Sequence, residues 1–349
     1  MAAVLFLISD IYLLNMTSLQ TQQYEQALQV LENGDYSRLE KIELLMQMAM
    51  GLQQRPKNAK QLFDAIDLYD RALALCLEMD DLLSARLHAR KATALHMIPS
   101  EDAEYLLSAQ RELESALPVI EAAQKSDQAA SIEEVAEIEM NLGLVIQTLA
   151  SFHKAKIADA VFWYQRALRV FTKTSYPTEF SILHNNLATA YLSIPMSDER
   201  GKMREALAVQ SFEAALEVVT LEENPTEYAM LQNNLGNALQ YASSSHAVEN
   251  NLRALEAYDA ALKVRDARVS PVAYANTISN KANCLLNLPD DPEHPEQGNQ
   301  KRMNEALKLY REAHKIFAQS DESGKAEVIA QILDDLENEM NKEQKTEVS

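Results

Sequence analysis

Two stretches of the chain, YPTEFSILHNNLATAY at 176–191 and NPTEYAMLQNNLGNAL at 224–239, carry nearly the same wording 48 positions apart. Self-similarity at a fixed spacing is typical of repeat proteins, whose units bury their apolar faces only against their neighbours. SPVAY at 270–274 begins in the same way. Proline suits the first position of a helix, so we expect helices to begin at 177, 225 and 271. Asn224 and Ser270 are the expected N-caps, and Glu227 would complete a capping box with Asn224.

Two further patterns accompany these helix starts. The first helix of each unit carries a large apolar residue followed by a small one, seen as Leu142-Gly143, Leu187-Ala188 and Leu235-Gly236, and less closely in MAMGL (48–52), KATAL (91–95) and KANCL (281–285). The second helix carries Ala-x-x-x-aromatic-x-x-Ala, as in Ala65, Tyr69, Ala72; Ala160, Tyr164, Ala167; Ala208, Phe212, Ala215; Ala254, Tyr258, Ala261; and Ala306, Tyr310, Ala313, with Leu113 replacing the aromatic residue between Ala109 and Ala116. We expect Leu187, Leu235, Tyr191, Phe212 and Tyr258 to be buried between paired helices.

Together these patterns resemble the tetratricopeptide repeat (TPR), a helix-turn-helix unit, in a long form similar to that of bacterial arrays. Successive second-helix markers are 44, 51, 48, 46 and 52 residues apart, against the usual 34 or so of the family. We place the extra residues between the two helices of a repeat, in polar segments such as 193–202, 241–251 and 288–301. The resemblance implies an all-α fold, a right-handed α-solenoid of six repeats with long intra-repeat loops.

The expected organisation has three parts. Residues 1–39 form an N-terminal segment with a half repeat at 24–32, residues 40–320 the six repeats, and residues 321–349 a capping helix and acidic tail. The apolar residues expected on one face of the capping helix are Val328, Ile329, Ile332, Leu333, Leu336 and Met340. Residues 1–14 are shorter than the roughly 20 apolar residues of a spanning helix and have no basic segment before them. They either form a first helix that packs on the end of the solenoid, or they precede Met16, which would then be the working initiator methionine.

Composition narrows the classes of function. A net charge of −20 opposes binding to nucleic acid and to anionic membranes, and favours protein partners with basic segments. Cys76 and Cys284 have no Cys or His companions, so they are expected to be packed thiols. The seven histidines show no metal-ligand spacing, and phosphate loops and nucleophile elbows are missing from the sequence. We therefore expect a cytoplasmic, non-catalytic protein without cofactor or metal; oligomeric state is left open.

Asparagine is the unusual feature of the first helices. Asn141, Asn186, Asn234 and Asn280 directly precede the Leu position of the Leu-small frame. Asn185 and Asn233 precede two of them, and Asn237 and Asn283 follow one turn later on the same face. Asn is a mediocre helix former, so its recurrence runs against local preference. In TPR arrays the first helices line the concave groove, where amides could pair with the backbone of an extended peptide. The alternative is that these amides bond to neighbouring helices and fix repeat stacking.

Arg86 and Arg90 lie four residues apart on one face of the second repeat, with Arg90 at the Asn position. The pattern partly resembles the carboxylate clamp of co-chaperone arrays, and a solvated basic face is the alternative. We expect a protein-interaction scaffold or adaptor whose peptide-binding residues are these eight asparagines with Arg86 and Arg90. A ligand-responsive or peptide-sensing regulator and an assembly factor for a larger complex are the alternatives.

Overall fold

The computed structural model describes residues 28–29, 31, 33–76, 80–126, 129–194, 199–242 and 246–347, with side chains except at 199–200, 339 and 341–347. Within these ranges the chain forms thirteen α-helices and one short 3₁₀ turn, and no strand is present. The predicted all-α class is confirmed. No helix in these ranges is long and apolar enough to cross a membrane.

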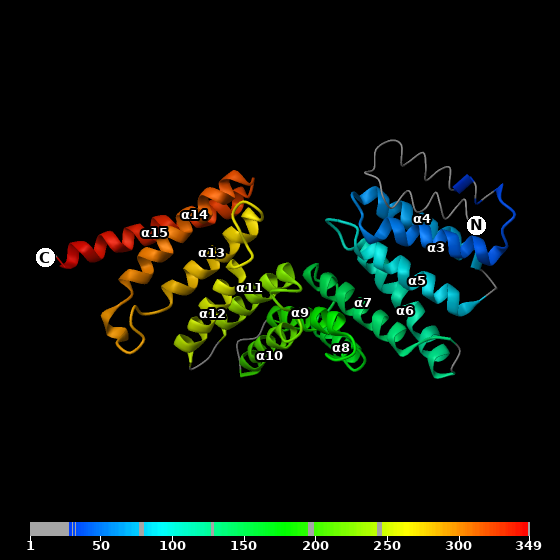
Figure 1. Ribbon diagram of the computed structural model, residues 1–349, viewed down its shortest axis with the longest axis horizontal. Helices are drawn as coiled ribbons and strands as arrows, with labels where there is room; N and C mark the ends of the chain where they lie inside the picture. The colour runs from blue at the N-terminus through cyan, green and yellow to red at the C-terminus, as the bar shows by residue number, and fades with distance from the viewer. Residues whose placement is uncertain are drawn as a thin grey trace. The chain divides into compact units, whose positions relative to one another are not determined.

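The helices pair as hairpins in the order of the sequence (Figure 1). The pairs are α3 (Arg38–Gln54) with α4 (Ala59–Cys76), α5 (Asp81–His96) with α6 (Glu104–Lys125), α7 (Ile132–Ser151) with α8 (Ile157–Ala167), α9 (Pro177–Ser193) with α10 (Glu199–Leu216), α11 (Pro225–Tyr241) with α12 (Ala247–Leu262), and α13 (Pro271–Leu286) with α14 (Gln300–Gln319), followed by α15 (Ser323–Glu347). The first three hairpins lie in one compact unit, which ends at Phe171, and the next three lie with α15 in a second, which begins at Thr172. We call these unit 1 and unit 2.

Six hairpins are what the sequence patterns predict for six repeats. The three-part division at residues 39 and 320 stays a prediction, because residues 1–27 lie outside the described part of the chain. The expected half repeat at 24–32 falls largely there as well. Leu31, which is described, is 4% exposed and packs on the core of the first hairpin.

The predicted helix starts at 177, 225 and 271 are confirmed, but the predicted caps are wrong. The side chains of Asn224 and Ser270 accept no hydrogen bond from the helix that follows. Instead, the backbone N–H before each proline closes a turn on the carbonyl four residues earlier, as Asn224 does on Thr220 at 3.0 Å. Proline removes one N–H from the first turn, so fewer donors need a cap. Complete capping boxes are found at Ser37 and Ser131 instead.

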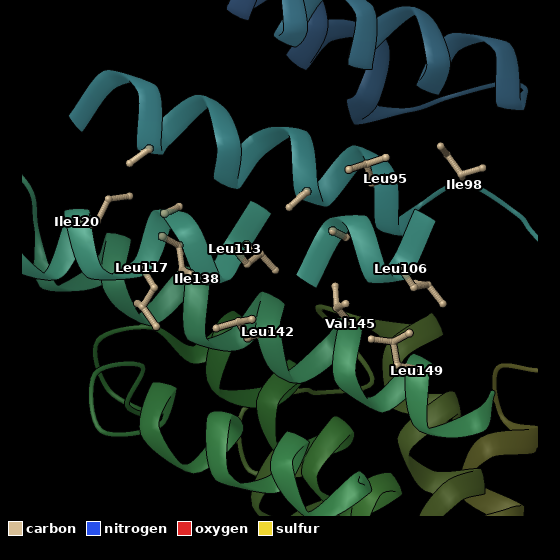
Figure 2. Packing of buried hydrophobic residues seen from close by; sticks show 14 of the residues in the cluster. Leu95, Ile98, Leu106, Leu113, Leu117, Ile120, Ile138, Leu142, Val145 and Leu149 are labelled. Atoms are coloured by element: carbon tan, nitrogen blue, oxygen red, sulfur yellow. The ribbon is translucent and has the colours of Figure 1, made fainter. Parts of the chain in front are cut away.

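The second-helix markers form the centre of each hairpin. The side chains of Tyr69, Leu113, Tyr164, Phe212, Tyr258 and Tyr310 are 0–2% exposed, and the alanines that flank them are 0–1% exposed. Leu187, Leu235 and Tyr191 are buried as predicted. Figure 2 shows how Leu113 of α6 and Leu142 of α7 contribute to one such apolar cluster in unit 1.

Glycine occupies two places where a tyrosine ring lies directly against the first helix of its hairpin. A Cβ atom added to Gly143 would lie 2.4 Å from Cε1 of Tyr164, and one added to Gly236 would lie 2.6 Å from Cε1 of Tyr258. Real Cβ atoms do not approach a ring this closely, so the ring occupies the space that a side chain would fill. The small residue of the predicted Leu-small pattern therefore exists to admit the aromatic residue of the partner helix.

The tyrosine hydroxyls meet a glutamine of the same hairpin. Tyr69 donates to Oε1 of Gln53 at 2.9 Å, Tyr164 to Gln147 at 2.7 Å, and Tyr258 lies 2.8 Å from Oε1 of Gln240. Each glutamine follows the large residue of the Leu-small pattern by five positions. A buried hydroxyl without a partner is costly, so this glutamine is part of the repeat that the sequence patterns had not included.

Both cysteines are buried and unlinked, as expected of packed thiols. Burial raises the pKa of the Cys284 thiol to about 12, and its Sγ contacts the carbonyl of Asn251 at 3.2 Å. The thiol is therefore protonated at neutral pH and unreactive.

Helix α15 covers the last hairpin. Ile329 and Leu336 are 6% and 9% exposed, and Ile332, Leu333 and Met340 pack on the same cluster. Val328 is 61% exposed, so its predicted place on the packed face is wrong. The helix reaches Glu347, beyond Met340, the last residue of the predicted packed face.

The extra length of the repeats lies partly in helix rather than in loops. Helix α9 extends to Ser193 and α10 begins at Glu199, so half of the 193–202 segment is helical; α12 similarly begins inside 241–251. The 288–301 segment is the long connection, and it is ordered by Asp290. Its carboxylate accepts the backbone N–H of Lys301 and that of Arg302, both at 2.9 Å, in the first turn of α14.

Replacing Gly236 with Leu should destabilise unit 2 by about 1–3 kcal/mol, because the new side chain overlaps the Tyr258 ring and must displace it. Urea unfolding followed by circular dichroism measures the change. Gly324→Leu is the matched control, since no atom lies within 4 Å of the Cβ position there. An equal loss in both variants would contradict the packing explanation.

Replacing Asp290 with Ala should lower the free energy of unfolding by about 0.5–2 kcal/mol, the range for loss of an N-cap carboxylate or hydroxyl. Glu293→Ala, in the same connection but without a bond to α14, should leave stability within about 0.5 kcal/mol. Thermal melts of the two variants side by side test this. If Asp290→Ala melts with the unchanged protein, the carboxylate does not cap α14.

Candidate functional site

A groove in unit 1 is formed by the first helices of its three hairpins. Its volume is about 630 Å³. We call it the α5 groove, because α5 contributes its central wall and α3 and α7 contribute the two sides. Its lining residues are Met50, Gln53 and Gln54 of α3; Arg86, Ala89, Arg90, Thr93 and Met97 of α5; Ile120 of α6; and Glu134, Glu137, Ile138 and Asn141 of α7. Within unit 1, the first helices therefore line a groove as the resemblance implied.

Arg86 is engaged inside the protein. Its Nε and Nη2 donate to the two carboxylate oxygens of Glu134 at 2.7 and 2.9 Å, and Nη2 also donates to the carbonyl of Ala129 at 2.7 Å. Glu134 is also the capping-box residue of α7, where its backbone N–H donates to the Ser131 hydroxyl. The hydrogen bond from Arg86 holds the pKa of Glu134 below its ordinary value. Arg86 thus ties α5 to the start of α7.

Arg90 is in a different position. It is exposed, it lines the groove one turn after Arg86, and it forms no hydrogen bond or ion pair within the described part of the chain. Of the two arginines singled out in the sequence, Arg90 is the one whose guanidinium is available to a ligand. Two of the predicted site residues are therefore brought together by α5, but they have different roles.

Asn141 brings the asparagine position of the third repeat into the same groove. It is half-buried and faces the groove together with the amides Gln53 and Gln54. Gln53 also accepts the bond from Tyr69, so one of its groups is already used. Sequence reasoning missed Gln53, Gln54, Met50 and Met97. The Leu-small pattern at Met48-Ala49 could have placed Met50 and Gln54 on this face, since they follow Met48 by two and six positions and are therefore one turn apart.

Five of the other asparagines lie in unit 2 and bond to one another. We call Asn185, Asn186, Asn233, Asn234 and Asn280 the amide ladder. Asn234 of α11 donates to Oδ1 of Asn185 of α9 at 3.4 Å, and Asn280 of α13 donates to Oδ1 of Asn233 of α11 at 3.3 Å. Asn185 donates to its neighbour Asn186 at 3.3 Å. The amides connect the first helices of successive hairpins, which is the geometry expected of stacking contacts.

These ladder bonds are long, and long hydrogen bonds are weak. Asn233 is 7% exposed, whereas Asn186, Asn234 and Asn280 are only half-buried. An amide has two donor hydrogens and an acceptor oxygen, so a single ladder bond leaves part of each half-buried amide unused. The structure thus supports stacking for Asn233 and leaves hydrogen-bonding groups on the others.

Asn237 and Asn283 contact tyrosines instead. Oδ1 of Asn237 lies 2.8 Å from the hydroxyl of the buried Tyr258. Asn283 donates to the hydroxyl of Tyr241 at 2.7 Å. Neither residue is a member of the amide ladder.

Comparison with known proteins supports the fold. No protein-family model matches the chain, and no curated protein matches it by sequence. The apo form of the quorum sensor NprR from B. thuringiensis superposes with a TM-score of 0.50 at 13% identity, covering 95% of this chain and 84% of that one. BtubC (BKLC) from P. vanneervenii gives a TM-score of 0.47 at 19% identity, covering 76% of this chain and 90% of that one. At such identities the likeness to NprR shows a shared TPR-like fold and no more.

Metal binding has no support in the described residues. No group of three or more His, Cys, Asp or Glu side chains in the described ranges is placed to hold a metal ion. The fold is of a kind that typically binds peptides or proteins.

Replacing Asn237 with Ala should cost about 1 kcal/mol, because the buried Tyr258 hydroxyl loses a partner. Asn186→Ala should be neutral or slightly stabilising, since it gives up a weak bond and Ala is the better helix former. A double-mutant cycle with Tyr258→Phe, read by urea unfolding, isolates the Asn237–Tyr258 term. A coupling energy near zero would show that the two side chains do not interact.

Proposed function

We propose that this chain is a non-catalytic scaffold or adaptor that holds an extended peptide, or one face of a partner helix, in the α5 groove. The observation that carries the proposal is Arg90: an exposed guanidinium with no hydrogen bond or ion pair to any described residue, in a groove lined mainly by α3, α5 and α7. At about 630 Å³ the groove lies within the 300–1,000 Å³ or so of typical ligand sites.

The remaining lining is suited to a peptide. Gln54 and Asn141 offer donors and acceptors that can pair with backbone groups without reading side chains. Met50 and Met97 are unbranched and polarizable, so they can adapt to apolar side chains of different shape. A groove of this composition binds the ligand backbone through amides, apolar side chains through methionine, and one acidic group through Arg90.

Charge then acts at two ranges. The net charge of −20 attracts partners that carry basic segments, and it does so over roughly a Debye length. Arg90 acts only at close range, where it selects an acidic group that faces α5. Glu137 lines the opposite side on α7 and would repel that group, so the ligand's orientation across the groove is fixed.

The amide ladder supports a second contact surface in unit 2. Asn186, Asn234 and Asn280 are half-buried and each retains unused hydrogen-bonding groups, which a passing backbone could engage. Asn233 and Asn237 are better explained as stacking and packing residues, given their burial and their partners. The binding hypothesis and the stacking alternative therefore apply to different members of the asparagine set.

The test is a selection of phage-displayed peptides on the purified protein, followed by titration of the selected peptides against variants. Arg90→Glu should weaken binding about tenfold or more, the equivalent of one charge-assisted hydrogen bond. Asn141→Ala should weaken it by a smaller factor. Arg111→Glu on α6, outside the α5 groove, is the charge-matched control and should leave affinity nearly unchanged. Peptides that bind all three variants like the original protein would place the site elsewhere.

A further inference from the structure

Unit 2 contains a separate cavity of about 350 Å³, formed where α9 and α11 end and α10 begins. Its lining residues are Tyr191, Leu192 and Ile194 of the α9 end, Gly201, Arg204 and Glu205 of α10, and Asn237 and Tyr241 of α11. It shares no residue with the α5 groove, and the inference drawn from it does not depend on the function proposed there.

Arg204 is the unusual residue of this cavity. Its Nη1 is buried and has no hydrogen-bond partner, and the guanidinium forms no ion pair with any described residue. A buried donor left unpaired loses its hydration without compensation, and a charged donor loses more. Native proteins pair most such groups, so an arginine in this state points to a partner that enters from outside.

Asn237 supplies a second hydrogen-bond donor, as a count of the hydrogens around the Tyr258 hydroxyl shows. The Tyr258 hydroxyl lies 2.8 Å from both Asn237 and Gln240 but has one hydrogen to donate. Nε2 of Gln240 is buried with no hydrogen-bond partner, and exchanging the oxygen and nitrogen ends of this amide lets Nε2 donate to Tyr258. Tyr258 then donates to Oδ1 of Asn237. The Nδ2 hydrogens of Asn237 remain for a group inside the cavity.

Tyr241 supplies the third donor. Its oxygen accepts a hydrogen bond from Nδ2 of Asn283 at 2.7 Å, so the hydroxyl hydrogen points elsewhere. The ring is 65% exposed at the mouth of the cavity. Arg204, Asn237 and Tyr241 thus offer donors from two helices around one small space.

We propose that this cavity binds a carboxylate carried by a peptide, either an acidic side chain or the chain terminus. A carboxylate has one negative charge and accepts several hydrogen bonds, two of them from one guanidinium. One arginine and two neutral donors match that charge, whereas a phosphate group near −2 would call for a second cation. Leu192 and Ile194 form an apolar wall for the neighbouring side chain of the peptide.

Glu205 makes it possible to test the charge of the bound group. It follows Arg204 on α10 and lines the same cavity. Its carboxylate repels a bound anion. Glu205→Gln removes this negative charge and should therefore tighten carboxylate binding. A cavity that binds neutral groups would show no such gain.

The experiment uses three fluorescein-labelled pentapeptides of one Ala/Leu-rich sequence and measures anisotropy with the full chain. The first has a central glutamate and an amidated end, the second a central glutamine and a free carboxylate end, and the third a glutamine and an amidated end. The first or the second should bind at least about tenfold more tightly than the third, and the preferred one identifies the carboxylate's source.

That preference should vanish in Arg204→Met, fall in Tyr241→Phe and grow in Glu205→Gln. Arg268→Met, at a surface arginine whose side chain is 92% exposed, controls for the loss of one positive charge and should retain the preference. Circular dichroism melts verify that Arg204→Met is folded, as expected for removal of an unpartnered group. Equal binding of all three peptides, or a preference that survives Arg204→Met, overturns the proposal and leaves the cavity to water.

Discussion

The contact between a second-helix aromatic ring and the small residue of the first helix is the interaction on which the hairpins depend. Where the ring is a tyrosine of the third or fifth repeat, the facing residue is Gly143 or Gly236, and no Cβ atom fits between. The alanines on either side of each ring are 0–1% exposed, so the helix backbones approach closely around it. The hydroxyl at the end of the ring then requires an amide, which Gln147 and Gln240 provide. One steric condition thus fixes three positions of the repeat.

This condition explains why the fold could be predicted from sequence. Ring, small residue and flanking alanines recur at fixed spacing, and each helix needs them for its own packing. Features that depend on a single distant residue were not predictable in this way. Asp290 reaches the first turn of α14 across ten residues of connection, and no periodic pattern marks it. The caps at Asn224 and Ser270 failed for a related reason, because the preceding backbone turn determines where those side chains lie.

The candidate site likewise combines features that follow from the helix period with features that depend on a distant residue. The Leu-small pattern placed Arg86, Arg90 and Asn141 on the groove face correctly, since the face of a helix follows from its period. It could not separate the two arginines, whose roles depend on a carboxylate 48 residues from Arg86. The capping signature at Ser131–Glu134 was visible in the sequence, but its connection to α5 follows only from the packing of α7 beside it.

Charge balance gives the unpaired arginines their significance. The chain has 52 acidic residues and 32 lysines and arginines, so a cation on this protein is surrounded by carboxylates more often than by cations. Lys91 accordingly bridges Asp70 and Glu112, and Arg166 bridges Glu121 and Glu139. Arg90 shares its groove with Glu134 and Glu137, and Arg204 shares its cavity with Glu205. Even so, neither arginine forms an ion pair with a described residue. Both guanidinium groups line cavities and neither is held by a carboxylate there, so an acidic ligand that enters can bind them.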